Sequence, residues 1–343
     1  MHNWRSSSAY ARGASHTEWG TPCQDRAVHY EWDGAHAIVL ADGAGSYESS
    51  HLGAELIVTK LAYYLCEKFD RLSSLESQKL AEELHFYIHQ ELNALVLEHD
   101  RNKEDFSSTL LFVVTKGQDY IAGHVGDGMI VKCESGDVEI LSAPENGLYE
   151  NETYFVSMET LDEHFRIYRG SVTEDLGFII MSDGSTASFL SKSQGLDTQN
   201  LGVIIDHFQK STANTFKHDL TELLAALVDN TDDDCSIAVL AASKEDPIPA
   251  EPSKLMAAIK GEQDAVPDDT VIHVEKSIDE LLAPREFEED EEEFHSTPDD
   301  MDDSDEDHDL YDNFEYEDFE DDLVELDAEE EIDSDGITDT YKN

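Results

Sequence analysis

The sequence predicts an α+β sandwich domain that continues into an acidic tail. Three observations support this prediction: strand-like segments follow one another, helical segments form separate blocks, and acidic residues accumulate toward the end of the chain. Polar turns at 116–119 and 134–137 separate strand-like segments, so antiparallel hairpins are expected. Strands and helices segregated in this way are typical of α+β folds rather than of parallel βαβ sheets.

The expected elements follow in order along the chain. An apolar run at 35–42 stops at an Asp-Gly pair and predicts a buried strand. Apolar residues at helical spacing then predict helices at about 51–69 and 75–98. A further helix is expected near 212–228. The remaining predicted strands are 108–115, 120–127, 129–133, 165–169, 178–182 and 235–240.

Charge is distributed very unevenly. The chain has 343 residues with 79 acidic and 22 basic side chains, a formal net charge of −57. Residues 262–343 contain 37 of the acidic residues and three basic ones, so this segment alone carries −34. Such a segment cannot bury a core. The acidic balance argues against binding to nucleic acid or to an anionic membrane, since both need clustered Lys and Arg.

We divide the chain where its composition changes. Residues 1–245 are expected to form the folded domain, 246–261 a Pro-containing linker, and 262–343 an acidic, largely disordered tail. Aromatic residues are interleaved with acids between 286 and 331. The tail is expected to be solubilising only, or to act as a docking or autoinhibitory segment, with mimicry of nucleic acid as a third alternative.

The compartment is inferred from apolar runs and cysteines. The chain has no run of 18 apolar residues, and its first residues lack the apolar core of a signal peptide. Its four cysteines lie far apart, which disfavours a disulfide framework and a zinc knuckle. We therefore expect a soluble cytoplasmic protein without a membrane or nucleic-acid partner.

Five aspartates stand at or beside the ends of predicted strands: Asp25, Asp42, Asp127, Asp183 and Asp233. A glycine after an aspartate, as at three of these positions, lets the backbone turn sharply and its carbonyl approach a cation. Converging carboxylates repel one another unless a cation lies between them, and oxygen ligands select Mg²⁺ or Mn²⁺ over Zn²⁺. Two such ions about 4 Å apart can share a hydroxide that attacks phosphorus in line. A single Asp-Gly pair usually marks only a turn, but five ordered aspartates favour a metal centre.

Six short motifs follow one another: His16, TPCQDR at 21–26, ADGAGS at 41–46, GHVGDG at 123–128, MSDGST at 181–186 and DDDCS at 232–236. Their order resembles the metal-dependent protein phosphatases of the protein phosphatase 2C (PPM) family, above all a bacterial subgroup with SH…PCQD and DGAGS motifs. The resemblance spans roughly 5–243. It implies a four-layer α-β-β-α sandwich with two central antiparallel sheets. It also implies hydrolysis of phosphoserine and phosphothreonine in proteins by a metal-bridging hydroxide.

The resemblance further implies roles for the matched residues. Asp42 is similar to the carboxylate that bridges two metal ions, with the carbonyl of Gly43 as a ligand of one of them. Asp183 and Asp233 match ligands of the other ion. The run 232–234 leaves the register open by one residue, and Asp233 is preferred because the small and hydroxyl residues that begin the last strand then follow it correctly.

Two more acids match, and three positions depart from the family pattern. Asp25 and Gln24 match a Glu-Asp pair that reaches the metal through water, and Asp127 matches an aspartate that helps hold a weaker third ion. Gln24 replaces a common carboxylate, which would loosen one metal. Gly20 stands where many members have a phosphate-clamping Arg, and Ala44 where eukaryotic members have a His thought to act as general acid.

Four histidines and one cysteine have both a functional and a structural interpretation. His16 is a candidate by position for the missing proton donor or clamp, against the alternative of a histidine satisfied by backbone hydrogen bonds. His85 and His89 have a zinc-binding spacing without the Glu of the protease motif, so a packed or solvated helix face is expected. His124 is expected to pack, and Cys23 to be a small buried thiol rather than an oxidation-sensitive one.

The resemblance implies a bacterial metal-dependent serine/threonine protein phosphatase that acts in signalling. The expected cofactors are Mn²⁺ or Mg²⁺, two ions with a weaker third. The expected catalytic residues are Asp42, Asp183, Asp233 and His16. The expected partners are phosphoproteins, with a cognate Ser/Thr kinase, and a basic partner for the tail. The alternative is a catalytically weak phosphatase-like binding or regulatory module that acts through its acidic tail.

Overall fold

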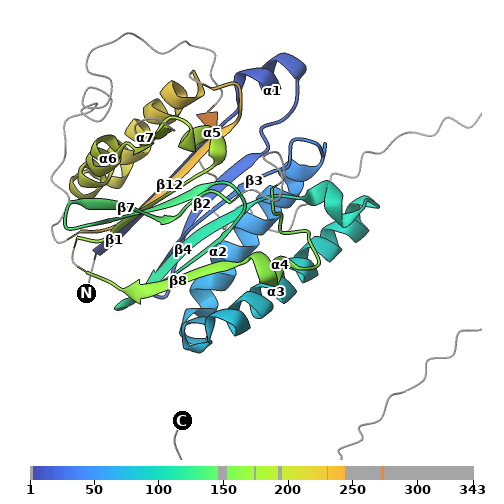
Figure 1. Ribbon diagram of the computed structural model, residues 1–343, viewed down its shortest axis with the longest axis horizontal. Coiled ribbons are helices and arrows are strands. Elements are labelled where there is room, and N and C mark those ends of the chain that lie inside the picture. The colour runs from blue at the N-terminus through green and yellow to red at the C-terminus, as the bar shows by residue number, and fades with distance from the viewer. Residues whose placement is uncertain are drawn as a thin grey trace, which may run out of the picture. The chain divides into compact units, whose positions relative to one another are not determined.

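The computed structural model describes residues 3–145, 153–173, 175–191, 195–229, 231–243 and 272–273 (Figure 1). The chain divides into two compact units, Met1–Arg285 and Glu286–Asn343, and every described residue belongs to the first. Among these residues, no helix is long and apolar enough to cross a membrane. The predicted linker and nearly all of the predicted acidic tail lie outside the described residues.

Two antiparallel sheets form the centre of the first unit. Their strand orders are β13-β1-β12-β9-β6-β7 and β2-β3-β4-β5-β8. The first sheet comprises Asn3–Ala11 (β1), Met129–Glu134 (β6), Asp137–Ser142 (β7), Gly177–Met181 (β9), Cys235–Ser243 (β12) and Ile272–His273 (β13). The second comprises Asp25–Trp32 (β2), Ala35–Asp42 (β3), Leu110–Lys116 (β4), Asp119–Val125 (β5) and Arg166–Ser171 (β8). Leu190–Ser191 (β10) and Gly195–Leu196 (β11) form a separate small hairpin.

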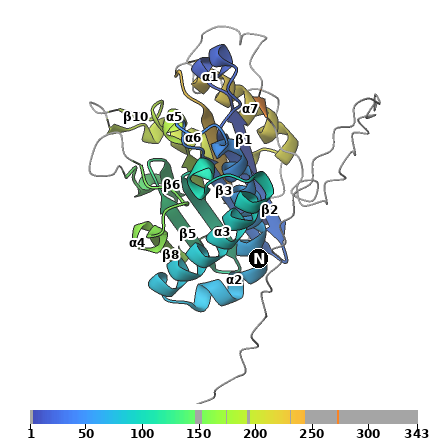
Figure 2. The ribbon, with the colours of Figure 1, turned by 90° about the vertical axis from the view of Figure 1, so that its right-hand side faces the viewer.

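Helices cover the outer face of each sheet (Figures 1 and 2). The second sheet packs against α2 (Ser50–Ser74) and α3 (Ser77–His99). The first sheet packs against α6 (Thr198–Lys210) and α7 (Ala213–Val228). The short helical elements are α1 (Ala14–Trp19), η1 (Lys103–Phe106), α4 (Leu161–His164) and α5 (Asp183–Thr186).

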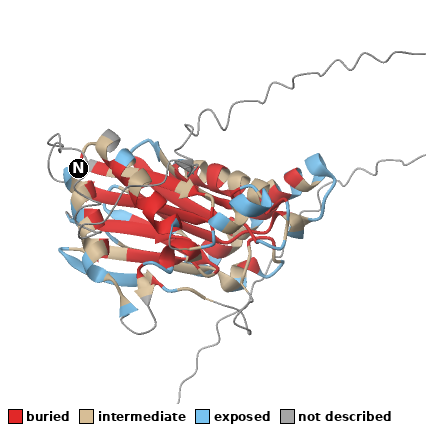
Figure 3. Ribbon diagram, turned by 90° about the horizontal axis from the view of Figure 1, so that it is seen from above, coloured by how far each residue is buried: buried red, intermediate tan, exposed pale blue. Residues whose placement is uncertain are grey.

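Three hydrophobic cores give the sandwich its four layers. One core lies between each sheet and its helices, and the third lies between the two sheets. In β3, Val39 packs toward the helices, whereas Ile38 and Leu40 pack between the sheets. Because successive residues of a strand face opposite sides, a strand buried on both faces has a continuous apolar sequence. Figure 3 shows the result, with buried strands inside and exposed positions at the periphery.

The predicted α+β fold class, with two central antiparallel sheets between helices, is confirmed. The helices predicted at 51–69 and 75–98 correspond to α2 and α3, and the one near 212–228 to α7. The polar turns at 116–119 and 134–137 close the hairpins β4–β5 and β6–β7.

One connection differs from the predicted series of hairpins. β5 and β6 belong to different sheets, so the chain crosses from one sheet to the other at 126–128. Gly126 adopts a φ of +109°, and a side chain there would lie 2.7 Å from the Thr109 side chain. Glycine is therefore required where the chain crosses.

Several elements have no counterpart among the predicted ones: β1, β2, β7, α1 and α6. β13 is a further case, because it lies beyond the predicted domain end at 245. Its two residues pair with Tyr10 and Ala11 of β1, so part of the chain after 245 belongs to the first sheet.

Candidate metal centre

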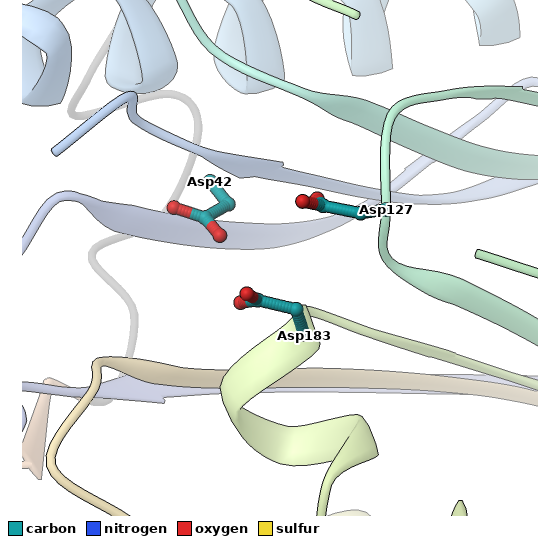
Figure 4. Close-up of side chains that lie close together, drawn as sticks. All are labelled: Asp42, Asp127 and Asp183. Carbon is teal, nitrogen blue, oxygen red and sulfur yellow. The ribbon is translucent and has the colours of Figure 1, made fainter. Parts of the chain in front are cut away.

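Strand ends from both sheets meet at one edge of the sandwich. Asp42 ends β3 and pairs in register with Asp25, the first residue of β2. Asp127 lies where the chain crosses between the sheets, Asp183 begins α5 directly after β9, and Asp233 precedes β12. Figure 4 shows the carboxylates of Asp42, Asp127 and Asp183 pointing toward one another. Acids that are far apart in sequence are thus brought to one place.

A pocket of about 170 Å³ opens at this edge. It is lined by His16, Gln24, Asp42, Gly43, Ala44, Gly45, Thr109, Asp127, Thr153, Phe155, Asp183 and Asp233. Six of the seven residues predicted for the site belong to this lining, and the seventh, Asp25, is buried with 1% exposure. His16 is the only basic side chain among the described lining residues.

Three of the lining acids form a close cluster. Asp42, Asp127 and Asp183 each offer a carboxylate oxygen, and these oxygens all lie within 4.8 Å of one another. Like charges at this separation repel strongly in partly buried surroundings. No Lys or Arg is among the described lining residues to compensate them. A divalent cation would relieve the repulsion.

Burial and mutual repulsion raise the pKa values of these acids. Burial holds the pKa of Asp42 well above its usual value, and the charge of Asp25 adds to the shift. Burial also raises the pKa of Asp183 to about 6, with further contributions from Asp127 and Asp233. The pKa of Asp233, the most exposed of the group, is raised chiefly by its partial burial. Several raised carboxylate pKa values in one pocket are typical of a functional site.

Asp25 is the most deeply buried acid of the group. Neither of its carboxylate oxygens has a hydrogen bond of ordinary length among the described residues. Its pKa is raised to about 8, first by burial and then by the charge of Asp234, against the opposing effect of the Ser236 and Ser182 side chains. Buried carboxylate oxygens without donors are unfavourable unless water or a cation satisfies them.

Two threonines fix the geometry of the acids. Thr109 Oγ1 accepts a hydrogen bond from the backbone N–H of Asp42 at 3.0 Å. Thr153 Oγ1 donates to Asp127 Oδ2 at 2.6 Å. Sequence reasoning missed both threonines, because neither belongs to a motif and no local pattern marks them. Thr109 reaches the pocket because it directly precedes β4, which pairs with β3. Thr153 reaches it through the loop before α4.

Gln24 is tied to the start of α2. Its Nε2 donates to the carbonyl of Tyr47 at 2.9 Å and to Ser50 Oγ at 2.7 Å. Its Oε1 is buried and has no hydrogen-bond partner among the residues the structure describes. Gln24 therefore places a neutral amide in the pocket lining where the family pattern has a carboxylate.

The acids of the run 232–234 do not all face the pocket. Asp233 lines the pocket, whereas Asp234 is 2% exposed and lies inside the protein. Asp234 accepts hydrogen bonds from the backbone N–H groups of Gly13 at 2.7 Å and Gln24 at 2.6 Å. Its Oδ2 also lies 2.9 Å from His16 Nδ1. This arrangement supports Asp233 as the residue that faces the site, and Asp234 is a site neighbour that sequence reasoning did not single out.

The positions that depart from the family pattern add no cation to the pocket. Ala44 contributes only a methyl group to the lining. Gly20 is exposed, ends α1 with a φ of +72°, and is not among the described lining residues. His16 thus remains the only basic side chain in the described lining.

The remaining histidines and Cys23 lie away from the pocket lining. His85 Nδ1 contacts Asp162 at 2.8 Å and His89 is buried, so the predicted packed helix face is confirmed. His124 is fully buried and packs within the sheet, as expected. Cys23 is buried as well, and burial raises its pKa well above the usual value, so its thiol stays protonated.

The donor atoms fit a hard divalent cation. The cluster offers carboxylate oxygens, and Gly43 and Gln24 belong to the same lining. The clustered donors include neither sulfur nor imidazole. Oxygen-only donors are the set that Mg²⁺ and Mn²⁺ prefer.

Comparisons with known proteins point the same way. The family model described as protein phosphatase 2C matches residues 12–227. Serine/threonine-protein phosphatase 3 of Escherichia coli (strain K12) is 27% identical over 162 residues, which are 46% of this chain and 64% of that relative. This chain thus spans slightly less than two thirds of the relative's length.

Solved structures show a likeness of fold. The S. agalactiae serine/threonine phosphatase has a TM-score of 0.50 at 17% identity, over 69% of this chain and 99% of that one. A variant of a bacterial serine phosphatase has a TM-score of 0.50 at 13% identity, over 71% of this chain and 100% of that one. At such identities the likeness concerns the fold alone.

Proposed function

Because the chain belongs to the protein phosphatase 2C family, we propose that it is a metal-dependent phosphatase that hydrolyses phosphoserine and phosphothreonine in proteins. The observation that carries this proposal is the convergence of Asp42, Asp127 and Asp183, with carboxylate oxygens within 4.8 Å of one another, at a pocket of about 170 Å³. A metal centre in a pocket open to the surface is what a phosphorylated side chain on another protein requires.

Two ions, Mn²⁺ or Mg²⁺, would be held mainly by Asp42, Asp183 and Asp233, with the Gly43 carbonyl as a further ligand. Bound ions of this kind polarise phosphoryl oxygens and lower the pKa of a water ligand. Asp127 would support a weaker third ion, and Asp25 would add charge from its buried position. These assignments follow the family pattern, and the raised pKa values of Asp42 and Asp183 support them.

The chain's own polar groups keep the acids in place. Thr109 holds the backbone at Asp42, and Thr153 holds the carboxylate of Asp127. His16 offers the only basic side chain in the described lining and is the group that would act on the phosphate or on the leaving hydroxyl. Pre-positioned groups of this kind spare the cost of reorganisation during the reaction.

The proposal extends to the rest of the chain. Residues 1–245 form the phosphatase domain, 246–261 a linker, and 262–343 an acidic tail, with the two residues of β13 returning to the domain. The partners are cytoplasmic phosphoproteins, a cognate Ser/Thr kinase whose action the enzyme reverses, and a basic protein for the tail.

A second candidate, a catalytically weak phosphatase-like binding module, is favoured by two observations. Gln24 supplies a neutral amide in place of a carboxylate, and Gly20 leaves the position of the arginine clamp without a side chain. In that case the acidic tail would carry the function by docking a basic partner.

Hydrolysis assays separate the two candidates. The full chain would be assayed on p-nitrophenyl phosphate and on a phosphothreonine peptide with Mn²⁺, with Mg²⁺ and with EDTA. Metal-dependent turnover that EDTA abolishes supports the enzyme. A folded protein without turnover under any of these conditions supports the binding module.

A further inference from the structure

The start of α1 is fastened to the loop that carries Asp233. The backbone N–H of Ser15 donates to the Asp232 carbonyl at 3.1 Å, and the Gly13 N–H donates to Asp234 Oδ1 at 2.7 Å. A Cβ on Gly13 would lie 2.4 Å from the backbone carbonyl of Asp233, so only glycine permits this approach. The two segments are more than 200 residues apart, and their contacts bring His16 to the pocket.

Asp234 accepts two backbone hydrogen bonds and lies close to a histidine ring. Its Oδ1 accepts from Gly13, and its Oδ2 accepts from the Gln24 N–H at 2.6 Å and lies 2.9 Å from His16 Nδ1. The contact with His16 is a close charge pair rather than an aligned hydrogen bond, because His16 Nδ1 makes no hydrogen bond within the described part of the chain. Because Asp234 is 2% exposed, its charge needs these donors, and the two backbone contacts hold its carboxylate rigidly.

This contact places the His16 ring beside the Asp234 carboxylate. Nδ1 is the ring nitrogen recorded beside Asp234, so a proton on Nδ1 would lie close to that carboxylate. The His16 side chain lines the pocket with 14% exposure, and Nε2 is its second ring nitrogen. A proton on Nε2 would make this nitrogen a donor for a ligand in the pocket.

A phosphate monoester entering this pocket meets many acids and few donors. Asp42, Asp127, Asp183 and Asp233 all line the pocket, and no Arg or Lys is found among the described lining residues. Bound cations would offset the acids, but a phosphoryl oxygen on the side of α1 still needs a hydrogen-bond donor. His16 is the side chain at that place.

We propose that Asp234 is a positioning residue that holds His16 so that its Nε2–H binds a phosphoryl oxygen of the substrate. The pair would take the place of the family's arginine clamp. This inference rests on the proposed phosphatase function and adds the group that recognises the phosphate itself.

Steady-state kinetics of the full chain with saturating Mn²⁺ test the pair. The variants are His16→Ala, Asp234→Asn and the double variant, with Asp232→Asn as the control that removes an exposed charge from the same run. We expect His16→Ala to raise KM for the phosphothreonine peptide and the inhibition constant of inorganic phosphate about 10-fold, with kcat changed less. Asp234→Asn has the same volume but one acceptor oxygen fewer, so the His16 ring loses its charged neighbour together with one backbone hydrogen bond, and a similar rise is expected. Asp232→Asn should match the wild type.

The double variant decides between positioning and a purely structural role. If Asp234 acts through His16, the double variant is no worse than His16→Ala, because residues that act as a unit are not additive. Full additivity would mean that Asp234 supports only the Gly13 and Gln24 backbone, and would overturn the proposal. An unchanged inhibition constant for phosphate in His16→Ala would overturn it too.

Two measurements do not depend on turnover. Calorimetric titration of inorganic phosphate into the Mn²⁺-loaded protein measures the contact directly, and each variant should bind Mn²⁺ within about threefold of the wild type. A wild type that binds phosphate through His16 but hydrolyses nothing would refute the proposed function and leave the pair standing. If Asp234→Asn does not fold, nitrogen NMR of wild-type His16 provides the test, because a neutral ring protonated only at Nε2 would contradict the proposal.

Discussion

Asp25 and Asp42 are directly opposite each other in the antiparallel pair of β2 and β3. Residues paired in this way point to the same face of the sheet, and like charges there are destabilising. The charge of Asp25 is among the causes that raise the pKa of Asp42, and burial with its neighbours raises the pKa of Asp25 to about 8. The sheet therefore holds two mutually repelling carboxylates at the edge where the metal centre is proposed.

The first prediction concerns pH and metal removal. An acid with a higher pKa in the folded than in the unfolded state binds its proton more tightly when folded, so raising the pH through that pKa destabilises the protein. The folded values are about 6 for Asp183 and about 8 for Asp25, against 3.8 for an ordinary Asp. In EDTA, the melting temperature should therefore fall between pH 5 and 8, by on the order of 5 °C.

Thermal melts in EDTA and in Mn²⁺ across this pH range provide the measurement. Mn²⁺ should raise the melting temperature more at pH 8 than at pH 5, since cations compete with protons for the same oxygens. Asp25→Asn should flatten the pH dependence in EDTA. A melting temperature in EDTA that rises over this range would show that folding does not raise the pKa values of these acids.

The second prediction concerns Asp42. Asp42→Asn keeps the volume of the side chain but removes the carboxylate proposed to bridge both ions, so metal-dependent hydrolysis should fall by at least about 100-fold. The metal-free variant should melt no lower than the wild type, because a repelled charge has been removed. Asp119→Asn is the matched control, since Asp119 is exposed at the opposite end of the second sheet. Activity retained within a few-fold in Asp42→Asn would exclude a two-metal centre at this position.

Four of the five aspartates could be placed from the sequence because each stands beside a readable strand, whereas Asp25 was placed by its motif. β3 is buried on both faces and therefore has an unbroken apolar sequence, which predicts both the strand and the position of Asp42 at its end. β1 gives no such signal, since Ser6, Ser7 and Ser8 occupy its middle and two of them are buried. Its position between β12 and β13 is decided by pairing, which a local pattern does not record.

Contacts between residues far apart in the sequence could not be predicted from local sequence patterns. The glycines that flank Asp127 are equally compatible with a hairpin turn and with the observed crossing between sheets. Asp234 looks like its neighbours in the run, and only the approach of Gly13 and Gln24 distinguishes it. The raised pKa values likewise arise from acids brought together by folding, not from any one motif.

The third prediction concerns Thr153. Thr153→Val removes the hydroxyl that donates to Asp127 at 2.6 Å and keeps the shape of the side chain. Supporting hydrogen bonds to metal-binding groups typically contribute 10- to 100-fold in metal affinity. Because Asp127 is assigned to the weaker third ion, we expect the Mn²⁺ concentration for half-maximal activity to rise by roughly 10-fold. Thr153→Ser should restore it, and equal Mn²⁺ dependence in Val and Ser variants would show that the hydrogen bond plays no part.

The fourth prediction concerns Gln24. Gln24→Glu introduces the carboxylate of the family pattern but removes the donor to the Tyr47 carbonyl and to Ser50. The new charge would face that carbonyl and the acids of the pocket, so the metal-free melting temperature should fall by several degrees. Gln24→Met, which loses the donors without adding charge, is the control. Mn²⁺ should raise the melting temperature of Gln24→Glu more than that of Gln24→Met. Equal increases in the two variants would argue that position 24 does not face a metal.

The fifth prediction concerns the end of the folded domain. Truncation after Arg285 removes the second compact unit and keeps β13, whereas truncation after Gly261 removes β13 as well. β13 pairs with Tyr10 and Ala11, directly before the segment that leads into α1 and His16. Loss of these hydrogen bonds costs about 1 kcal/mol each and leaves the β1 edge open. The shorter chain should therefore melt a few degrees lower and associate more readily, as measured by calorimetry and light scattering.

The chain that ends at Arg285 should match the full-length protein within about 2 °C. Equal melting of the two truncated chains would place the end of the stable domain near 245, as the composition of the sequence predicts, and would make β13 a dispensable contact.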